Sequence, residues 1–185
     1  PASQHLLHAL DEGAAKQAEE WGAFDFMLEK KAKGLLKHVG FSFHDKAEVL
    51  DKILTRHPEM EYVQLQLNYL DWEDERIQSR KCYETAVKHG KRVMVMEPLK
   101  GGSLADIPKE AEKLMREMHP DMSPASWAIR FAASLDAVDF VLSGMSCDEH
   151  LDDNLSYMTD FVPLTDAERE VLAKVTDIIK SSIAI

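Results

Sequence analysis

The sequence has 185 residues, of which 45% are hydrophobic, enough to bury the core of one globular domain spanning residues 1–185. Its formal net charge of −11 excludes nucleic acid and anionic membranes as main partners, because no cluster of Lys or Arg offsets the acidity. No run of about 18 apolar residues is present, and the two cysteines lack metal-ligand spacing, so we expect a cytoplasmic protein without a metal site.

Strands separated by helices are predicted in the first half of the chain. A helical pattern after Gly13 runs to Gly34 and predicts one helix, and Asp45 is placed to cap the next helix. Alternation in the third predicted strand sets Gln64 and Gln66 on the same face. The short apolar runs that predict these strands are residues 4–10, 37–44 and 62–67.

The second half is organised around residues 91–102, an apolar run that ends in a polar turn with two glycines. The run predicts a short strand buried on both faces, which is typical of a parallel sheet. The loop from Glu97 to Gly102 would leave the carboxyl end of this strand, where α/β proteins bind ligands, although a plain strand-to-helix turn accounts for the same pattern. The other predicted elements are helices from about Ser79, Lys109 and the cap Ser123, helices opened by the capping boxes Ser146-x-x-Glu149 and Thr165-x-x-Glu168, and a strand at residues 138–143.

Five repeats of a strand followed by a helix predict an α/β fold, either a doubly wound sheet or a (β/α)8 TIM barrel. No G-x-G-x-x-G motif follows a predicted strand, which disfavours the dinucleotide fingerprint of the doubly wound class. The segments at the strand ends are Leu7-His8-Ala9, Gly40-Phe41-Ser42-Phe43-His44, Val63-Gln64, Met96-Glu97-Pro98-Leu99-Lys100-Gly101-Gly102, and Val141-Leu142-Ser143-Gly144-Met145 leading to Glu149 and Asn154.

This ordered series resembles the second part of the aldo-keto reductase barrel and covers about residues 5–176. It is similar to the bacterial and archaeal branch in which a small iron–sulfur domain follows the barrel. The resemblance implies a (β/α)8 barrel, of which this chain holds only strands four to eight with their helices and the C-terminal helix. It also implies reduction of a small-molecule carbonyl by NADPH bound across the carboxyl ends of the strands. An iron–sulfur cluster would belong only to a domain that is not in this chain.

The resemblance assigns four residues to the reacting end of the cofactor. His8 matches the active-site histidine that orients the substrate carbonyl, and an ordinary strand-end histidine is the alternative. Ser42 and Gln64 match the residues that hold the nicotinamide carboxamide, since both can donate and accept hydrogen bonds. Met96 takes a position often held by a stacking aromatic, where a thioether can still pack on the ring. Phe43 stands where many relatives have Asn, which removes one carboxamide contact.

The phosphates and the adenosine fall to the last two loops. Main-chain N–H groups of the first loop would lie near the pyrophosphate, and Ser146 and the helix after it offer donors to a 2′-phosphate. Relatives specific for NADPH have Lys and Arg where this chain has Gly144 and His150, so NADP(H) is expected and NAD(H) stays open. The residues assigned to this part of the cofactor are Leu99, Lys100, Gly101, Gly144, Met145, Ser146, His150 and Asn154.

The Tyr, Lys and Asp that deliver the proton in this family have no match in the sequence, so we expect a part of a reductase that is inactive alone. Two alternatives stay open: a non-catalytic module that binds or senses a nicotinamide dinucleotide, and a barrel enzyme acting on a phosphorylated substrate at its last two loops. Five strands would expose two sheet edges and the apolar faces of Leu6, Val39, Val63 and Val95. We expect these surfaces to be covered either by an upstream segment that closes the barrel, which is the favoured alternative, or by a second copy in a homodimer.

Overall fold

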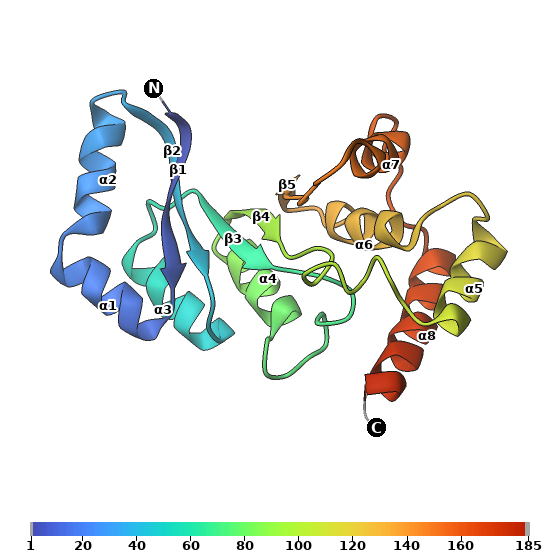
Figure 1. The fold of residues 1–185 in the computed structure, drawn as a ribbon. Helices are drawn as coiled ribbons and strands as arrows, with labels where there is room; N and C mark the ends of the chain where they lie inside the picture. The colour runs from blue at the N-terminus through green and yellow to red at the C-terminus, as the bar shows by residue number, and fades with distance from the viewer. Residues whose placement is uncertain (1, 184–185) are drawn as a thin grey trace.

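The computed structural model describes residues 2–183, which form one parallel β-sheet and eight helices (Figure 1). The five strands cross the sheet in sequence order, and every neighbouring pair is parallel. The carboxyl ends of all strands therefore lie along one edge of the sheet, which positions the candidate site. The strands are β1 (Ala2–Leu10), β2 (Leu36–Phe43), β3 (Tyr62–Gln66), β4 (Arg92–Met96) and β5 (Val138–Val141).

Helices follow the strands, as a parallel sheet requires. In Figure 1, α1 and α2 stand beside β1 and β2, whereas α5 and α8 lie together at the far end of the molecule. The helices are α1 (Glu12–Glu20), α2 (Ala23–Ala32), α3 (Ala47–Arg56), α4 (Ser79–Lys88), α5 (Lys109–Met118), α6 (Pro124–Ala133), α7 (Asp148–Met158) and α8 (Asp166–Ile183).

The apolar residues of the central strands face the helices. Val39, Val63 and Val95 are each 0% exposed and pack in one cluster with residues of α1 to α4. The prediction that these valines lie on an uncovered face is therefore wrong, because the pleat turns them to the helical side. The opposite face carries Gln64 and, in register with Gly40, the half-buried Leu6.

A second hydrophobic cluster joins α5, α6, α8 and the loop after β3 around the fully buried Trp127. The capping box that starts α8 is confirmed, since the Thr165 N–H donates to Glu168 Oε2 at 2.7 Å and the Glu168 N–H donates to Thr165 Oγ1 at 3.3 Å. Arg130 Nη1 also donates to Glu168 Oε1 at 2.6 Å. Burial would raise the pKa of Glu168, but the hydrogen bonds from Arg130 and Thr165 outweigh it and lower the pKa to about 2.

Two helices begin differently from the sequence predictions. The single helix expected between Gly13 and Gly34 is two helices, because Gly22 takes a left-handed conformation with φ of +66° and turns the chain. Asp45 does not cap α3, whose N-cap is Lys46. Its carboxylate instead accepts the main-chain N–H of Glu12 at 3.0 Å, and so joins the loop after β2 to the start of α1.

Of the two N-caps predicted at Ser123 and Ser146, one is confirmed and one is wrong. Ser123 caps α6 as predicted, with Oγ accepting the N–H of Ser126 at 3.0 Å. Ser146 does not cap α7, because this helix begins at Asp148 with Cys147 at its N-cap and no side-chain cap. Ser146 Oγ lies 3.5 Å from His150 Nδ1 instead.

Within the described residues, none of the helices is long and apolar enough to cross a membrane. Both cysteines are free thiols, and burial raises the pKa of Cys82 to about 12, so this thiol is protonated at neutral pH. No three His, Cys, Asp or Glu side chains of residues 2–183 come together in a way that could hold a metal ion.

Candidate functional site

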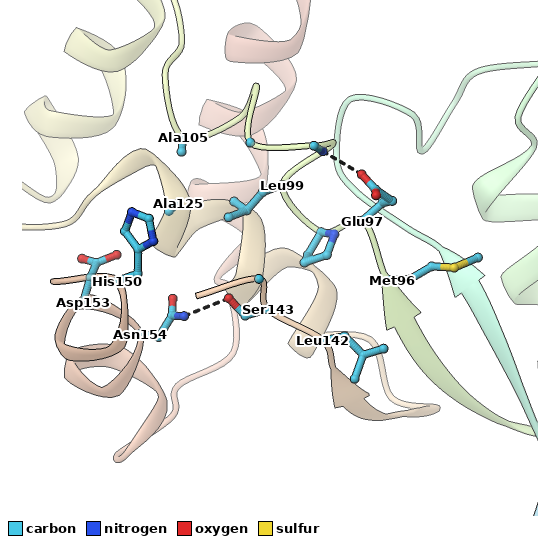
Figure 2. Close-up of a pocket in the computed structure, with 14 residues that line it drawn as sticks. Met96, Glu97, Leu99, Ala105, Ala125, Leu142, Ser143, His150, Asp153 and Asn154 are labelled. Carbon is cyan, nitrogen blue, oxygen red and sulfur yellow. Dashed lines mark hydrogen bonds between the residues drawn. The ribbon is translucent and has the colours of Figure 1, made fainter. Parts of the chain in front are cut away.

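A cavity of about 500 Å³ opens at the carboxyl ends of β4 and β5 (Figure 2). Its walls come from the loop after β4, the start of α6, the loop after β5, and α7, and the side chains of Figure 2 lie around it. This is the edge of a parallel sheet where ligands bind in α/β proteins. The lining residues are Met96, Glu97, Pro98, Leu99, Gly101, Gly102, Ala105, Ala125, Leu142, Ser143, Gly144, His150, Asp153 and Asn154.

The loop after β4 has a left-handed backbone at four positions. Glycines account for two of them, with φ of +63° at Gly101 and +94° at Gly102, whereas Glu97 and Lys100 adopt this region at φ of +57° and +48°. The main-chain oxygen of Glu97 accepts the N–H of Lys100 at 3.1 Å, and its carboxylate Oε2 accepts the N–H of Gly101 at 2.6 Å. Several N–H groups of the loop therefore donate hydrogen bonds to acceptors within the loop itself.

Two buried polar side chains, Asn68 and Asp71, hold this loop to the loop after β3. Lys100 Nζ donates to the two carboxylate oxygens of Asp71 at 2.6 and 2.8 Å, and the Asp71 side chain is only 5% exposed. Asn68 Nδ2 donates both to Asp71 Oδ2 at 2.9 Å and to the main-chain oxygen of Glu97 at 3.2 Å. The Lys100 ammonium is thus neutralised by Asp71, and the residue does not line the cavity.

Polar side chains of α7 and the loop before it form the opposite wall. Asn154 Nδ2 donates to Ser143 Oγ at 2.9 Å, and Tyr157 donates to the Asn154 amide oxygen. Asp153 Oδ2 accepts the hydroxyl of Ser123 at 2.7 Å. Both ends of the Asn154 amide and one oxygen of Asp153 therefore have partners within the chain.

His8, Ser42 and Gln64 lie on three neighbouring strands, outside the residues that line the cavity. The buried Ser42 Oγ accepts the N–H of Ala9 at 2.6 Å, where Ala9 has φ of +56° and the β1–β2 register shifts. Ser42 thus stabilises a β-bulge directly after His8, and bulges of this kind re-aim the side chains beside them. Gln64 pairs with Ser42 in register, and its Nε2 lies 3.3 Å from Met96 Sδ.

The structure brings six of the residues predicted for the cofactor around one cavity and leaves the others beside or outside it. Ser146 lies next to His150, and Met145 is exposed outside the lining. Asp153, Ala105 and Ala125 were not predicted. Asp153 lies three positions after His150 on one helix, a spacing that places both on one face, whereas the alanines carry no chemical signal. The six are Met96, Leu99, Gly101, Gly144, His150 and Asn154.

Comparison with known proteins decides the family. The Aldo/keto reductase family model matches residues 6–177, which is nearly the whole chain. The chain belongs to the aldo/keto reductase family. The predicted α/β fold of the (β/α)8 barrel type is thereby confirmed, with the parallel five-stranded sheet matching aldo-keto reductase structures. No curated protein matches the chain.

Solved aldo-keto reductases share this fold at low sequence identity. The holo form from Bacillus halodurans superposes with a TM-score of 0.68 at 22% identity, over 94% of this chain and 60% of its own. The enzyme from Klebsiella pneumoniae, solved in complex with NADPH, gives 0.67 at 17% identity over 94% and 58%. The enzyme from Brucella melitensis gives 0.67 at 18% identity over 94% and 60%. The chain therefore spans about 60% of the length of these aldo-keto reductases.

Proposed function

We propose that this chain carries the cofactor site of an oxidoreductase that reduces a small-molecule aldehyde or ketone with a nicotinamide dinucleotide. The observation that carries the proposal is the cavity at the carboxyl ends of β4 and β5, in a chain of the aldo/keto reductase family. The cofactor would supply the hydride, and the residues of this chain would bind and orient it. The NADPH in the Klebsiella pneumoniae structure supports this choice of cofactor class.

The cavity has room for a dinucleotide, but few of its lining side chains can carry the positive charge that would attract phosphates. A Cβ placed on Gly102 or Gly144 would meet no atom within 4 Å, so both sides of the cavity have room for a ligand near the main chain. The main-chain N–H groups of Leu99 and Gly101 would face the pyrophosphate, and Asn154 the adenine, whereas the Lys100 N–H stays bound to the Glu97 carbonyl oxygen. Of the described residues that line the cavity, none is Lys or Arg, and His150 is the one side chain that can become cationic.

The reacting end of the cofactor would lie along β1 to β4. Ser42 Oγ accepts the Ala9 N–H and keeps its own proton, which it would donate to the carboxamide oxygen. Gln64, in register beside it, would bind the same carboxamide, and Met96 would pack on the nicotinamide ring. His8, which the bulge presents at the end of β1, would orient the substrate carbonyl.

A second candidate, a non-catalytic module that binds the dinucleotide, is favoured by the state of the tyrosines. Burial raises the pKa values of Tyr62, Tyr69 and Tyr157, which is the opposite of what a proton donor in carbonyl reduction needs. The hydroxyl of Tyr83 accepts the main-chain N–H of Ala137. We therefore infer that the 185-residue chain binds the cofactor without turning it over.

Titration of the purified chain with NADPH and NADH, followed by intrinsic fluorescence, tests the proposed function. Both should bind, and NADPH should be preferred by less than about a hundredfold, because charge-assisted contacts to the 2′-phosphate are missing. A preference of about a thousandfold would contradict the expected weak phosphate site. In the same samples an added aldehyde should cause no NADPH oxidation, and turnover would overturn the non-catalytic reading.

We propose that the protein is cytoplasmic. We also propose that the chain forms a homodimer, because one edge of its sheet carries exposed apolar side chains. Phe140 lies in β5, Leu142 and Met145 follow it, and the three side chains are 50%, 44% and 46% exposed. Among the described residues, β5 pairs on one side only. Pairing of two such edges would cover this apolar surface. Light scattering should therefore give twice the monomer mass, and replacing Phe140 by Asp should return the monomer. A wild-type monomer across the micromolar range would exclude this association.

A further inference from the structure

The carboxylate of Glu97 accepts a hydrogen bond from a main-chain N–H of its own loop, the loop after β4. Its Oε2 accepts the Gly101 N–H at 2.6 Å, a bond that Figure 2 marks with a dashed line, and both residues line the cavity. A carboxylate that accepts a main-chain N–H in a glycine-containing turn takes the position that such turns offer to a phosphate oxygen. The anion site of this loop is therefore filled by the chain itself.

The surroundings do not neutralise this carboxylate. Among the described residues Glu97 forms no ion pair, and the cation nearest in sequence, Lys100, is committed to both oxygens of Asp71. The other carboxylate of the cavity, Asp153, accepts the hydroxyl of Ser123 on the opposite wall. Glu97 thus places a negative charge where the proposed function places a pyrophosphate.

Main chain and side chain of Glu97 differ in how firmly they are held. The Glu97 carbonyl oxygen accepts the N–H of Lys100 at 3.1 Å and the side-chain amide of Asn68 at 3.2 Å. The side chain itself is exposed and has the Gly101 N–H as its hydrogen-bond partner in the described structure. The carboxylate can therefore rotate away about its own side-chain bonds while the loop keeps its shape.

We propose that Glu97 is an internal competitor of the cofactor: its carboxylate holds the Gly101 N–H in the free protein and must leave before the pyrophosphate can take it. The inference rests on the proposed function and adds a residue that sets cofactor affinity. It predicts that replacing Glu97, although this residue is polar and lies in the binding loop, increases the affinity for the dinucleotide. The competition combines a hydrogen bond with charge repulsion, and the repulsion weakens as salt screens it.

Two variants separate these two parts. Glu97→Gln removes the charge and keeps an oxygen that can accept the Gly101 N–H, whereas Glu97→Ala removes both. Each variant is titrated with NADPH and with NADH at low and high salt, beside Glu110→Gln, which makes the same charge change at an exposed position on α5. Circular dichroism and the melting temperature of each variant check that the fold is kept.

We expect Glu97→Gln to bind both dinucleotides about three- to tenfold more tightly than the wild type at low salt, and less so at high salt. Glu97→Ala should bind at least as tightly as Glu97→Gln, and Glu110→Gln should match the wild type. Tightening in Glu97→Ala alone would assign the competition to the hydrogen bond and still support the proposal. Unchanged or weaker binding in both folded variants would overturn the inference and leave the proposed function standing. Absence of binding in all four proteins would overturn the proposed function itself.

Discussion

Replacing Glu168 by Ala should lower the free energy of unfolding by about 3–5 kcal/mol, because it leaves the Arg130 guanidinium buried without its partner. The two side chains are 4% and 5% exposed, and their ion pair ties the start of α8 to α6. The change also removes the acceptor of the Thr165 N–H at the start of α8. Urea denaturation followed by circular dichroism measures the loss. The matched variant Glu170→Ala, exposed on the same helix, should change the stability by less than about 0.5 kcal/mol.

The same carboxylate predicts a pH dependence. The folded-state pKa of Glu168 is lowered from 4.5 to about 2, so the unfolded chain binds the proton more tightly than the folded chain. Its contribution, about 3 kcal/mol, is therefore fully present above about pH 5 and disappears as the pH falls toward 2. Glu168→Ala should show a shallower loss of stability over this range than the wild type. Parallel curves of stability against pH for the two proteins, or a loss of unfolding free energy below about 1 kcal/mol at neutral pH, would show that the ion pair does not stabilise the contact between α6 and α8.

Replacing Gly40 by Ala should destabilise the fold by about 2–4 kcal/mol, since β2 and β3 approach too closely there for any side chain. A Cβ at Gly40 would lie 2.3 Å from the main-chain oxygen of Tyr62 and 2.8 Å from its ring. Because Gly40 and Tyr62 are register partners in the middle of the sheet, the strands themselves would have to separate. Thermal denaturation of the variant measures the cost.

Gly13→Ala is the control for this variant. Gly13 lies in the first turn of α1, where an added Cβ would meet only a side-chain oxygen of Asp11 at 3.5 Å. Alanine is the better helix former, so this variant should be unchanged or up to about 1 kcal/mol more stable. If Gly40→Ala melted like Gly13→Ala, the close approach of β2 and β3 at Tyr62 would not exist in solution.

The order of strands and helices could be predicted because apolar runs and caps are local signals. The strand around Val95, the Ser123 cap and the Thr165–Glu168 box all depend on residues within a few positions of one another. The face that each strand turns to the helices was not predictable in the same way. Val39 and Val63 alternate with Gly40 and Gln64, so the pattern separates the two faces of each strand but does not tell which of the two faces the helices cover.

The candidate site was predictable where it depends on the backbone and not where it depends on distant partners. The two glycines of the loop after β4 predict left-handed backbone in a turn, and Gly101 lines the cavity as expected. Lys100 was assigned to the cofactor, yet its ammonium belongs to Asp71, which lies 29 positions earlier. Ser42 was assigned to the carboxamide, and its hydroxyl also holds the bulge at Ala9, a bond between strands that no local pattern shows.

The strand order of the sheet has a consequence for how the chain folds. Each strand pairs only with the strands that precede and follow it in the sequence, so the sheet can grow one β/α unit at a time as the polypeptide emerges from the ribosome. Each parallel pairing has to wait for the helix and loops between its two strands, so the sheet forms more slowly than the local contacts of the helices. Until the next strand of the same chain is synthesised, the last strand of the sheet has an unpaired edge. A strand of a neighbouring nascent chain can pair with this edge instead. The connection between β4 and β5 is the longest, so the edge of β4 stays unpaired for the longest time during synthesis, and we expect misassembly to begin there.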